Sequence, residues 1–131
     1  MLGKYPDQVK LVIKHFPLSK HQYARMAAGA ALAAGSQGKF WEFHHKLFQN
    51  YRSITSAKIQ EIAKELDLEM VKFNEDRNSA AIHALINRDL KNGRQIGVRG
   101  TPSVFINGKM LRRKTVNEFY RKIDAELQKG K

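Results

Sequence analysis

A hairpin predicted at residues 103–112 constrains the fold of this chain more than any other feature. Residues 103–106, Ser-Val-Phe-Ile, have the composition of a strand, and Asn107-Gly108 is the dipeptide that favours a type I′ turn. Residues 110–112 then return as the partner strand. The tripeptide Gly-Thr-Pro at residues 100–102 precedes the hairpin, and proline is common at the first position of a strand.

Helical periodicity dominates the segment between residues 19 and 97. The predicted helices cover residues 19–35, 39–50, 56–66, 69–76 and 79–97. Ser19 and Gln22 form a capping box at the start of the first helix, in which the alanines and Gly29 allow close packing. The third helix is strongly amphipathic, because apolar residues recur at i, i+3, i+4 and i+7 from Ile59 to Leu66. The apolar face predicted for the fifth helix consists of Ile82, Leu85 and Ile86.

Two further elements flank this helical segment and the hairpin. Residues 9–16, Val-Lys-Leu-Val-Ile-Lys-His-Phe, are predicted to form a mostly buried strand that ends at Pro17. Residues 115–128 are predicted to form the last helix, which begins with a capping box of Thr115 and Glu118. The order is strand, helices, hairpin, helix. With 131 residues and no repeats or linker, we expect a single domain over residues 1–131.

The chain is strongly basic, with a net charge of +12. Its 24 Lys and Arg residues are scattered, and the densest cluster is Lys109, Arg112, Arg113 and Lys114. No aromatic residue lies within that cluster to stack on bases. We therefore expect a solvated basic surface and no nucleic-acid partner. No apolar run approaches the ~20 residues of a membrane span, and the N-terminus does not resemble a signal peptide.

The chain contains no cysteine, which excludes disulfides, thiolate nucleophiles and thiolate metal ligands. The five histidines are His15, His21, His44, His45 and His83. Adjacent histidines on a helix point about 100° apart, and no His-Glu-x-x-His motif is present. Neither a phosphate-binding glycine loop nor a Ser-His-acid motif is visible. We predict no metal, no cofactor and no catalytic residue.

Trp41 and its neighbouring phenylalanines leave two interpretations open. They could line a peptide-binding groove, or they could belong to the core, where aromatic residues at helical spacing more often lie.

Three sequence segments carry a family resemblance: Phe-Pro-Leu at residues 16–18, Gln-Gly-Lys-Phe-Trp-Glu-Phe-His at residues 37–44, and residues 97–109. In this order they resemble the DsbA-like branch of the thioredoxin superfamily, which contains bacterial thiol:disulfide oxidoreductases. The resemblance extends from about Tyr5 to Leu127. It implies an α/β, thioredoxin-like fold with residues 19–97 as a helical insertion. It also suggests the periplasm or cell envelope, although the compartment stays unknown.

The resemblance assigns a role to the loop before the hairpin. In this family the proline that corresponds to Pro102 is cis, and its loop faces the redox-active cysteines. The resemblance therefore implies that Arg99, Gly100, Thr101 and Pro102 bind an extended polypeptide or a partner protein. Thr101 would offer its N–H and C=O as a neighbouring strand does, whereas Pro102 has no N–H to donate. Without the resemblance, Thr-Pro could simply begin a strand.

The chain departs from the family at its chemical centre. The family places Cys-x-x-Cys at the start of the helix after its first strand, and this chain resembles the family only beyond that helix. We therefore expect an N-terminally truncated, redox-inactive domain. A non-redox peptide-binding or protein-binding module is the alternative. The DNA upstream of the Met1 codon would discriminate between them.

The missing first strand also has a consequence for assembly. It would leave residues 9–16 and 103–106 with open edges, which recruit other strands. We expect either that these two strands pair directly or that the chain forms a homodimer.

Overall fold

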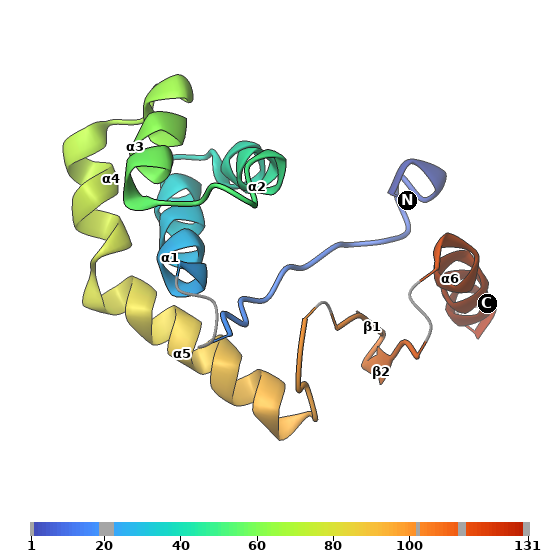
Figure 1. The fold of residues 1–131 in the computed structure, drawn as a ribbon. Helices are drawn as coiled ribbons and strands as arrows, with labels where there is room; N and C mark the ends of the chain where they lie inside the picture. The colour runs from blue at the N-terminus through green and yellow to red at the C-terminus, as the bar shows by residue number, and fades with distance from the viewer. Residues whose placement is uncertain (1, 19–22, 102, 113–114, 130–131) are drawn as a thin grey trace. The chain divides into compact units, whose positions relative to one another are not determined.

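The computed structural model describes residues 2–18, 23–101, 103–112 and 115–129 (Figure 1). Its elements are η1 (Leu2–Lys4), α1 (Ala24–Gly35), α2 (Phe40–Gln49), α3 (Ser56–Glu65), α4 (Met70–Arg77), α5 (Ala80–Gln95), β1 (Phe105–Ile106), β2 (Lys109–Met110) and α6 (Val116–Lys129). They form two compact units, which we call the helical unit (residues 15–97) and the terminal unit (residues 1–14 and 98–131).

The alanine-rich helix α1 is the centre of the helical unit. It contacts α2, α3, α4 and α5, which are grouped around it in Figure 1. Small side chains make this possible, since four alanines and Gly29 of α1 are buried. A Cβ atom at Gly29 would lie 3.1 Å from the backbone oxygen of Arg77, the last residue of α4. The glycine therefore permits a close approach between α1 and α4.

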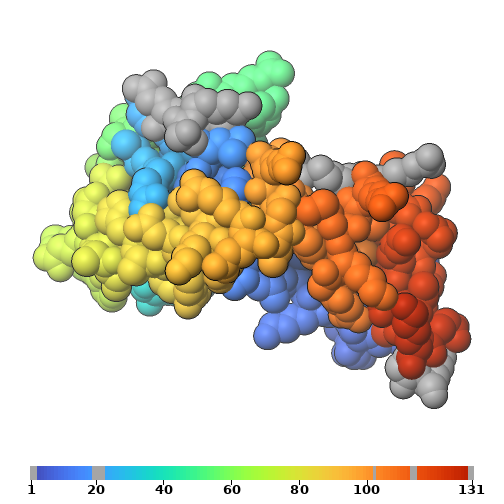
Figure 2. Space-filling model, turned by 90° about the horizontal axis from the view of Figure 1, so that it is seen from below, coloured from blue at the N-terminus to red at the C-terminus, as the bar shows by residue number. Residues whose placement is uncertain are grey.

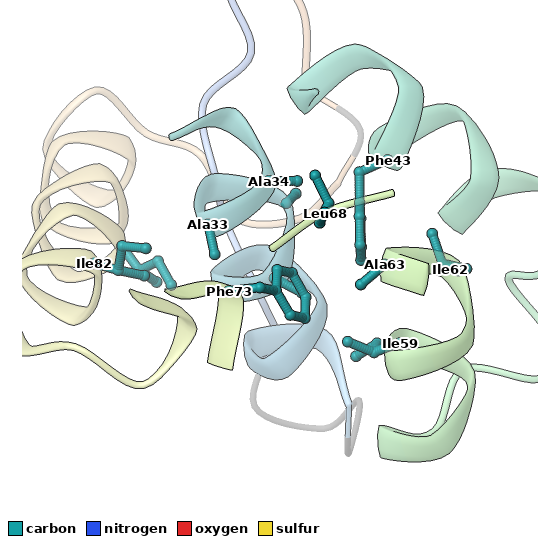
Figure 3. Packing of buried hydrophobic residues seen from close by; sticks show 12 residues of the cluster. Ala33, Ala34, Phe43, Ile59, Ile62, Ala63, Leu68, Phe73 and Ile82 are labelled. Atoms are coloured by element: carbon teal, nitrogen blue, oxygen red, sulfur yellow. The ribbon is translucent and has the colours of Figure 1, made fainter. Parts of the chain in front are cut away.

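Two phenylalanines from different helices fill the interior next to α1. Phe43 of α2 and Phe73 of α4 are both fully buried, and their ring centroids lie 5.7 Å apart. Figure 3 shows them with the side chains of Ile59 and Ile62, which come from α3. Full burial of a side chain of this size stabilises a fold by about 1.5–3 kcal/mol. The apolar face predicted for α3 is confirmed.

Side-chain caps define where several helices begin. The Thr55 hydroxyl accepts a hydrogen bond from the Lys58 N–H at 3.1 Å at the start of α3. The Ser79 hydroxyl accepts one from the Ile82 N–H at 3.2 Å at the start of α5. Both starts agree with the sequence prediction, because an N-cap satisfies a backbone donor that has no partner within the helix.

Two predictions about these elements are wrong, and a third falls partly on residues outside the described ones. Helix α1 is described from Ala24, with Tyr23 in a turn, while the predicted start at residue 19 and the capping box of Ser19 and Gln22 lie outside the described residues. Leu85 was expected on the apolar face of α5, but 37% of its surface is exposed. The strand predicted at residues 9–16 is wrong, since residues 9–18 form neither helix nor strand.

The terminal unit contains the predicted hairpin. Strand β1 pairs antiparallel with β2, in the register Phe105 to Met110 and Ile106 to Lys109. Asn107 and Gly108 have φ angles of 48° and 80°. Positive φ at both central positions is what a type I′ turn requires. Among the described residues these two strands form the only sheet, so the predicted pairing of residues 9–16 with residues 103–106 is not formed.

Helix α6 and the N-terminal segment complete the terminal unit. The Thr115 hydroxyl accepts a hydrogen bond from the Glu118 N–H at 3.2 Å, as the capping prediction required. Among the described residues of this unit, three side chains are buried: Tyr5, Leu111 and Ile123. The mostly helical architecture with a small sheet agrees with the predicted thioredoxin-like fold class. A single domain over residues 1–131 stays a prediction.

Candidate functional site

The loop before β1 contains the residues that the sequence assigned to substrate binding. Arg99 and Thr101 are exposed, and Gly100 is half-buried. The Ser103 hydroxyl donates a hydrogen bond to the Gly100 oxygen at 2.6 Å, which fixes the backbone at the middle of the loop. Pro102 lies outside the described residues, so the cis bond between Thr101 and Pro102 stays a prediction.

The hairpin that follows this loop is attached to α6 by an ion pair. The Lys109 ammonium donates a hydrogen bond to the Glu126 carboxylate at 3.0 Å, and Lys129 lies 3.5 Å from the same oxygen. The hydrogen bond from Lys109 lowers the pKa of Glu126, and the charges of Lys109 and Lys129 act in the same direction. The carboxylate therefore stays ionised and links the hairpin to the helix.

The helical unit has a second distinctive surface feature, an aromatic–histidine cluster on and beside α2. The cluster consists of His15, Phe40, Trp41, His44 and Phe48. The imidazole of His44 stacks on the Phe40 ring with centroids 5.7 Å apart, and it also meets the Phe48 ring edge-on at 4.8 Å. Trp41 and Phe48 are 49% and 63% exposed. The aromatic residues of α2 are thus divided, with Phe43 in the core and these two at the surface.

Both histidines of the cluster have a lowered pKa. Burial lowers the pKa of His15, and the charge of His44 adds to this effect, while Asp89 opposes it. Burial also lowers the pKa of His44, together with the charge of His45. The backbone N–H of His15 donates to the Asp89 carboxylate at 3.0 Å, which holds the His15 backbone at α5. Both imidazoles therefore favour the neutral form in the folded chain.

No group of three or more His, Asp and Glu side chains among the described residues is arranged to hold a metal ion. His45 forms a hydrogen bond with Gln49 at 3.2 Å. His21 lies outside the described residues.

The family of this chain follows from its match to known sequences. A sequence profile described as thioredoxin matches residues 1–125. The chain belongs to the thioredoxin family. A solved structure with a similar fold is the thiol-disulfide exchange protein alpha-DsbA2 from Wolbachia pipientis. The TM-score is 0.77 and the identity 25%, and the match covers 88% of this chain and 64% of that one. The chain is a DsbA-like domain of the thioredoxin superfamily.

Two curated relatives of this thioredoxin-family chain are considerably longer than the chain. A probable disulfide bond formation protein D from Bacillus cereus is 29% identical over 130 residues, which cover 93% of this chain and 60% of that protein. A Na⁺/H⁺ antiporter, NhaA 3 from Salinispora tropica, is 39% identical over 105 residues, which cover 77% of this chain and 16% of the antiporter. Within the described part of this chain, no helix has the length and apolar character to cross a membrane.

Sequence reasoning located the loop and the hairpin but missed the aromatic–histidine cluster as a unit. The whole of α1 lies between His15 and Phe40 in the sequence, yet their rings lie 6.0 Å apart. A sequence signal existed only on α2, where His44 follows Phe40 and precedes Phe48 at a spacing of four residues.

Proposed function

We propose that this chain is a peptide-binding, DsbA-like domain without redox chemistry of its own, and that residues 99–102 form its binding loop. The supporting observation is the loop geometry: the Gly100 oxygen is held by Ser103 at 2.6 Å, while the neighbouring Arg99 and Thr101 are exposed. A fixed backbone with exposed neighbours can present the N–H and C=O of Thr101 to an extended peptide. Such main-chain pairing provides affinity in strand addition.

The absence of redox chemistry in this proposal follows from composition. Thiol–disulfide exchange requires a thiolate as the attacking group, and the chain has no cysteine. A serine cannot replace it, because the exchange proceeds through a mixed disulfide. We infer that the chain binds polypeptides without oxidising or reducing them.

Two origins of such a binding domain remain as alternatives. The chain is either the peptide-facing part of a thiol:disulfide oxidoreductase or a non-redox module with a partner of its own. The names of the Bacillus cereus relative and of the Wolbachia pipientis structure support the first. The antiporter match covers 16% of that protein, so ion transport is not carried over. The N-terminal truncation stays a prediction, which the sequence upstream of Met1 would test.

Fluorescence anisotropy with a labelled, extended peptide would test the binding loop. Thr101→Pro removes the backbone N–H of Thr101, whereas Thr101→Val keeps it and preserves the side-chain shape. We expect binding to be lost in the first variant and retained in the second. Thermal unfolding of both variants identifies any loss of fold. Equal binding by both well-folded variants would contradict the proposal.

Chemical-shift mapping would locate the peptide independently of these substitutions. The expected perturbations lie at residues 99–106 of the ¹⁵N-labelled chain. Perturbations centred instead on Trp41 and Phe48 would place binding at the aromatic–histidine cluster and overturn the assignment to the loop.

The homodimer is also retained as a proposal. The support is the unpaired outer edge of β1, because each strand of the described two-stranded sheet pairs on one side only. Light scattering coupled to gel filtration tests it, and a single species of 15.0 kDa, the mass of one chain, would exclude the dimer.

A further inference from the structure

The positive charge of the chain is concentrated in the terminal unit. In the sequence, residues 1–14 and 98–131 carry 12 basic and 4 acidic residues, which gives a net charge of +8 over 48 residues. Residues 15–97 carry 12 basic and 8 acidic residues, which gives +4 over 83 residues. The smaller unit, which contains the proposed binding loop, thus has twice the net charge of the larger one.

Internal pairs occupy three of the four acidic residues of the terminal unit. Asp124 accepts a hydrogen bond from the Tyr5 hydroxyl at 2.7 Å. The other two are bound by basic residues: Glu126 by Lys109 at 3.0 Å and Glu118 by Arg121 at 2.7 Å. All three belong to α6 and are engaged within the unit. They leave little negative charge to neutralise cations elsewhere on its surface.

The remaining cations include two arginines close to the binding loop and the hairpin. Arg99 begins the loop, and Arg112 follows β2 after one residue. Both side chains are exposed, and neither forms an ion pair with a described acidic residue of this unit. Lys109, between them in sequence, is 66% exposed although it is paired. Figure 2 shows the hairpin (orange) beside α6 (red) at the surface of the unit. The loop and the hairpin are therefore flanked by cationic side chains.

The exposed apolar side chains of the terminal unit are aliphatic or thioether groups. Met110 and Val116, on either side of Arg112 in sequence, are 46% and 57% exposed. The aromatic residues of the unit are buried or half-buried: Tyr5, Phe105, Phe119 and Tyr120. The Lys4 ammonium also covers the Tyr120 ring, 4.1 Å from its centroid. Among the described residues of the unit, this surface therefore has no exposed aromatic platform on which single-stranded nucleic acids could stack. Its aliphatic groups suit the side chains of a polypeptide.

We propose that the terminal unit selects polypeptide segments in which Asp and Glu alternate with aliphatic residues, and that Arg99 and Arg112 bind their carboxylates. The planar guanidinium group forms two parallel hydrogen bonds with a carboxylate, which gives both affinity and orientation. This substrate class rests on the proposed function, because the same loop supplies the backbone contacts.

Three labelled peptides of equal length test the substrate class by fluorescence anisotropy. One alternates Glu with Val, the second replaces each Glu by Gln, and the third replaces each Glu by Lys. We expect the Glu peptide to bind at least about tenfold more tightly than the Gln peptide and the Lys peptide to bind most weakly. The preference should shrink as salt rises from about 0.05 M to about 0.3 M, because screening shortens the reach of exposed charges.

A charge-matched pair of variants separates local contacts from overall charge. The double variant Arg99→Gln/Arg112→Gln should lose most of the preference for the Glu peptide. The control Lys64→Gln/Lys91→Gln removes the same charge from exposed positions of the helical unit, in α3 and α5. It should retain the preference. An equal loss in both double variants would show that net charge alone attracts the peptide and would overturn the assignment to the two arginines.

The outcomes also separate this inference from the proposed function. If the Glu and Gln peptides bind with equal affinity, and Thr101→Pro abolishes the binding of both, the acidic substrate class is overturned. The loop then remains the binding element. No binding of any peptide would overturn both. A single-stranded oligonucleotide that binds the terminal unit more tightly than the Glu peptide under the same salt would identify a nucleic-acid surface and overturn the inference.

Discussion

The Tyr5 hydroxyl donates a hydrogen bond to the Asp124 carboxylate at 2.7 Å, across 119 residues of sequence. Tyr5 is only 4% exposed, and its ring packs edge-to-face on Tyr120 at 6.0 Å. Burial raises the pKa of Tyr5 to about 12, and the hydrogen bond to Asp124 acts in the same direction. The hydroxyl therefore stays protonated and keeps donating at neutral pH. This contact ties the N-terminal segment to α6.

Tyr5→Phe should loosen α6 selectively. The substitution keeps the ring but removes the hydrogen-bond donor to Asp124. Of the two N-terminal partners of Asp124, Tyr5 and Lys4, only the Lys4 ammonium at 3.8 Å then remains. Amide hydrogen exchange should become faster in residues 116–129 and remain unchanged in the helical unit. Tyr51→Phe is the control, because it makes the same change at a side chain that is 65% exposed. Unchanged exchange in α6 would show that the hydroxyl contributes little.

Gly29→Val should destabilise the helical unit. A Cβ atom added at this position would lie 3.1 Å from the Arg77 oxygen, so a branched side chain must push α1 and α4 apart. Overpacking of this kind costs about 1–3 kcal/mol, which chemical denaturation would measure. Ala81→Val on an exposed position of α5 is the control and should have a much smaller effect. A fully stable Gly29→Val variant would contradict the close approach.

Stability of the helical unit should fall in mild acid because of His15 and His44. The folded state lowers the pKa of both imidazoles, mainly by burial. An unfolded histidine titrates near 6.5, so below that pH the unfolded chain binds more protons than the folded one. The two histidines therefore contribute fully to the stability of the folded state above about pH 6.5. This contribution is lost as the pH falls from about 6.5 toward their lowered pKa values.

Urea unfolding at a series of pH values measures this dependence. In the double variant His15→Gln/His44→Gln, the free energy of unfolding should change less with pH just below about pH 6.5. In His83→Gln, which lies outside the aromatic–histidine cluster, the pH dependence should be retained. Both variants keep Asp89, which faces His15 and opposes the lowering of its pKa. Both also keep His45, which lies beside His44. The same pH dependence in all three proteins would show that other groups cause it.

The purified chain should neither form, reduce nor isomerise disulfides. The reason is the complete absence of cysteine, since no other side chain can carry the mixed-disulfide intermediate. Insulin reduction and the refolding of a scrambled substrate are suitable assays. Turnover above that of a blank without protein would refute the proposal that binding occurs without redox chemistry.

The features predicted correctly from the sequence depend on interactions between near neighbours. Asn107-Gly108 specifies its turn because both residues tolerate positive φ, and Thr55 and Ser79 cap helices through N–H groups three residues away. The periodicity of α3 likewise defined its buried face. These outcomes require only the local chain geometry and a nearby apolar interior, so a single sequence is sufficient for them.

The features that sequence reasoning missed depend on partners far away along the chain. Residues 9–16 have the composition of a strand, but a strand forms only where another backbone accepts and donates its hydrogen bonds, and composition does not provide that partner. Periodicity placed Phe43 and Phe48 on the same helix. The packing of α4 against α1 buries Phe43, whereas Phe48 stays exposed. The contact between Tyr5 and Asp124 has the same origin: tertiary packing sets the distance between two residues, and their spacing in sequence does not.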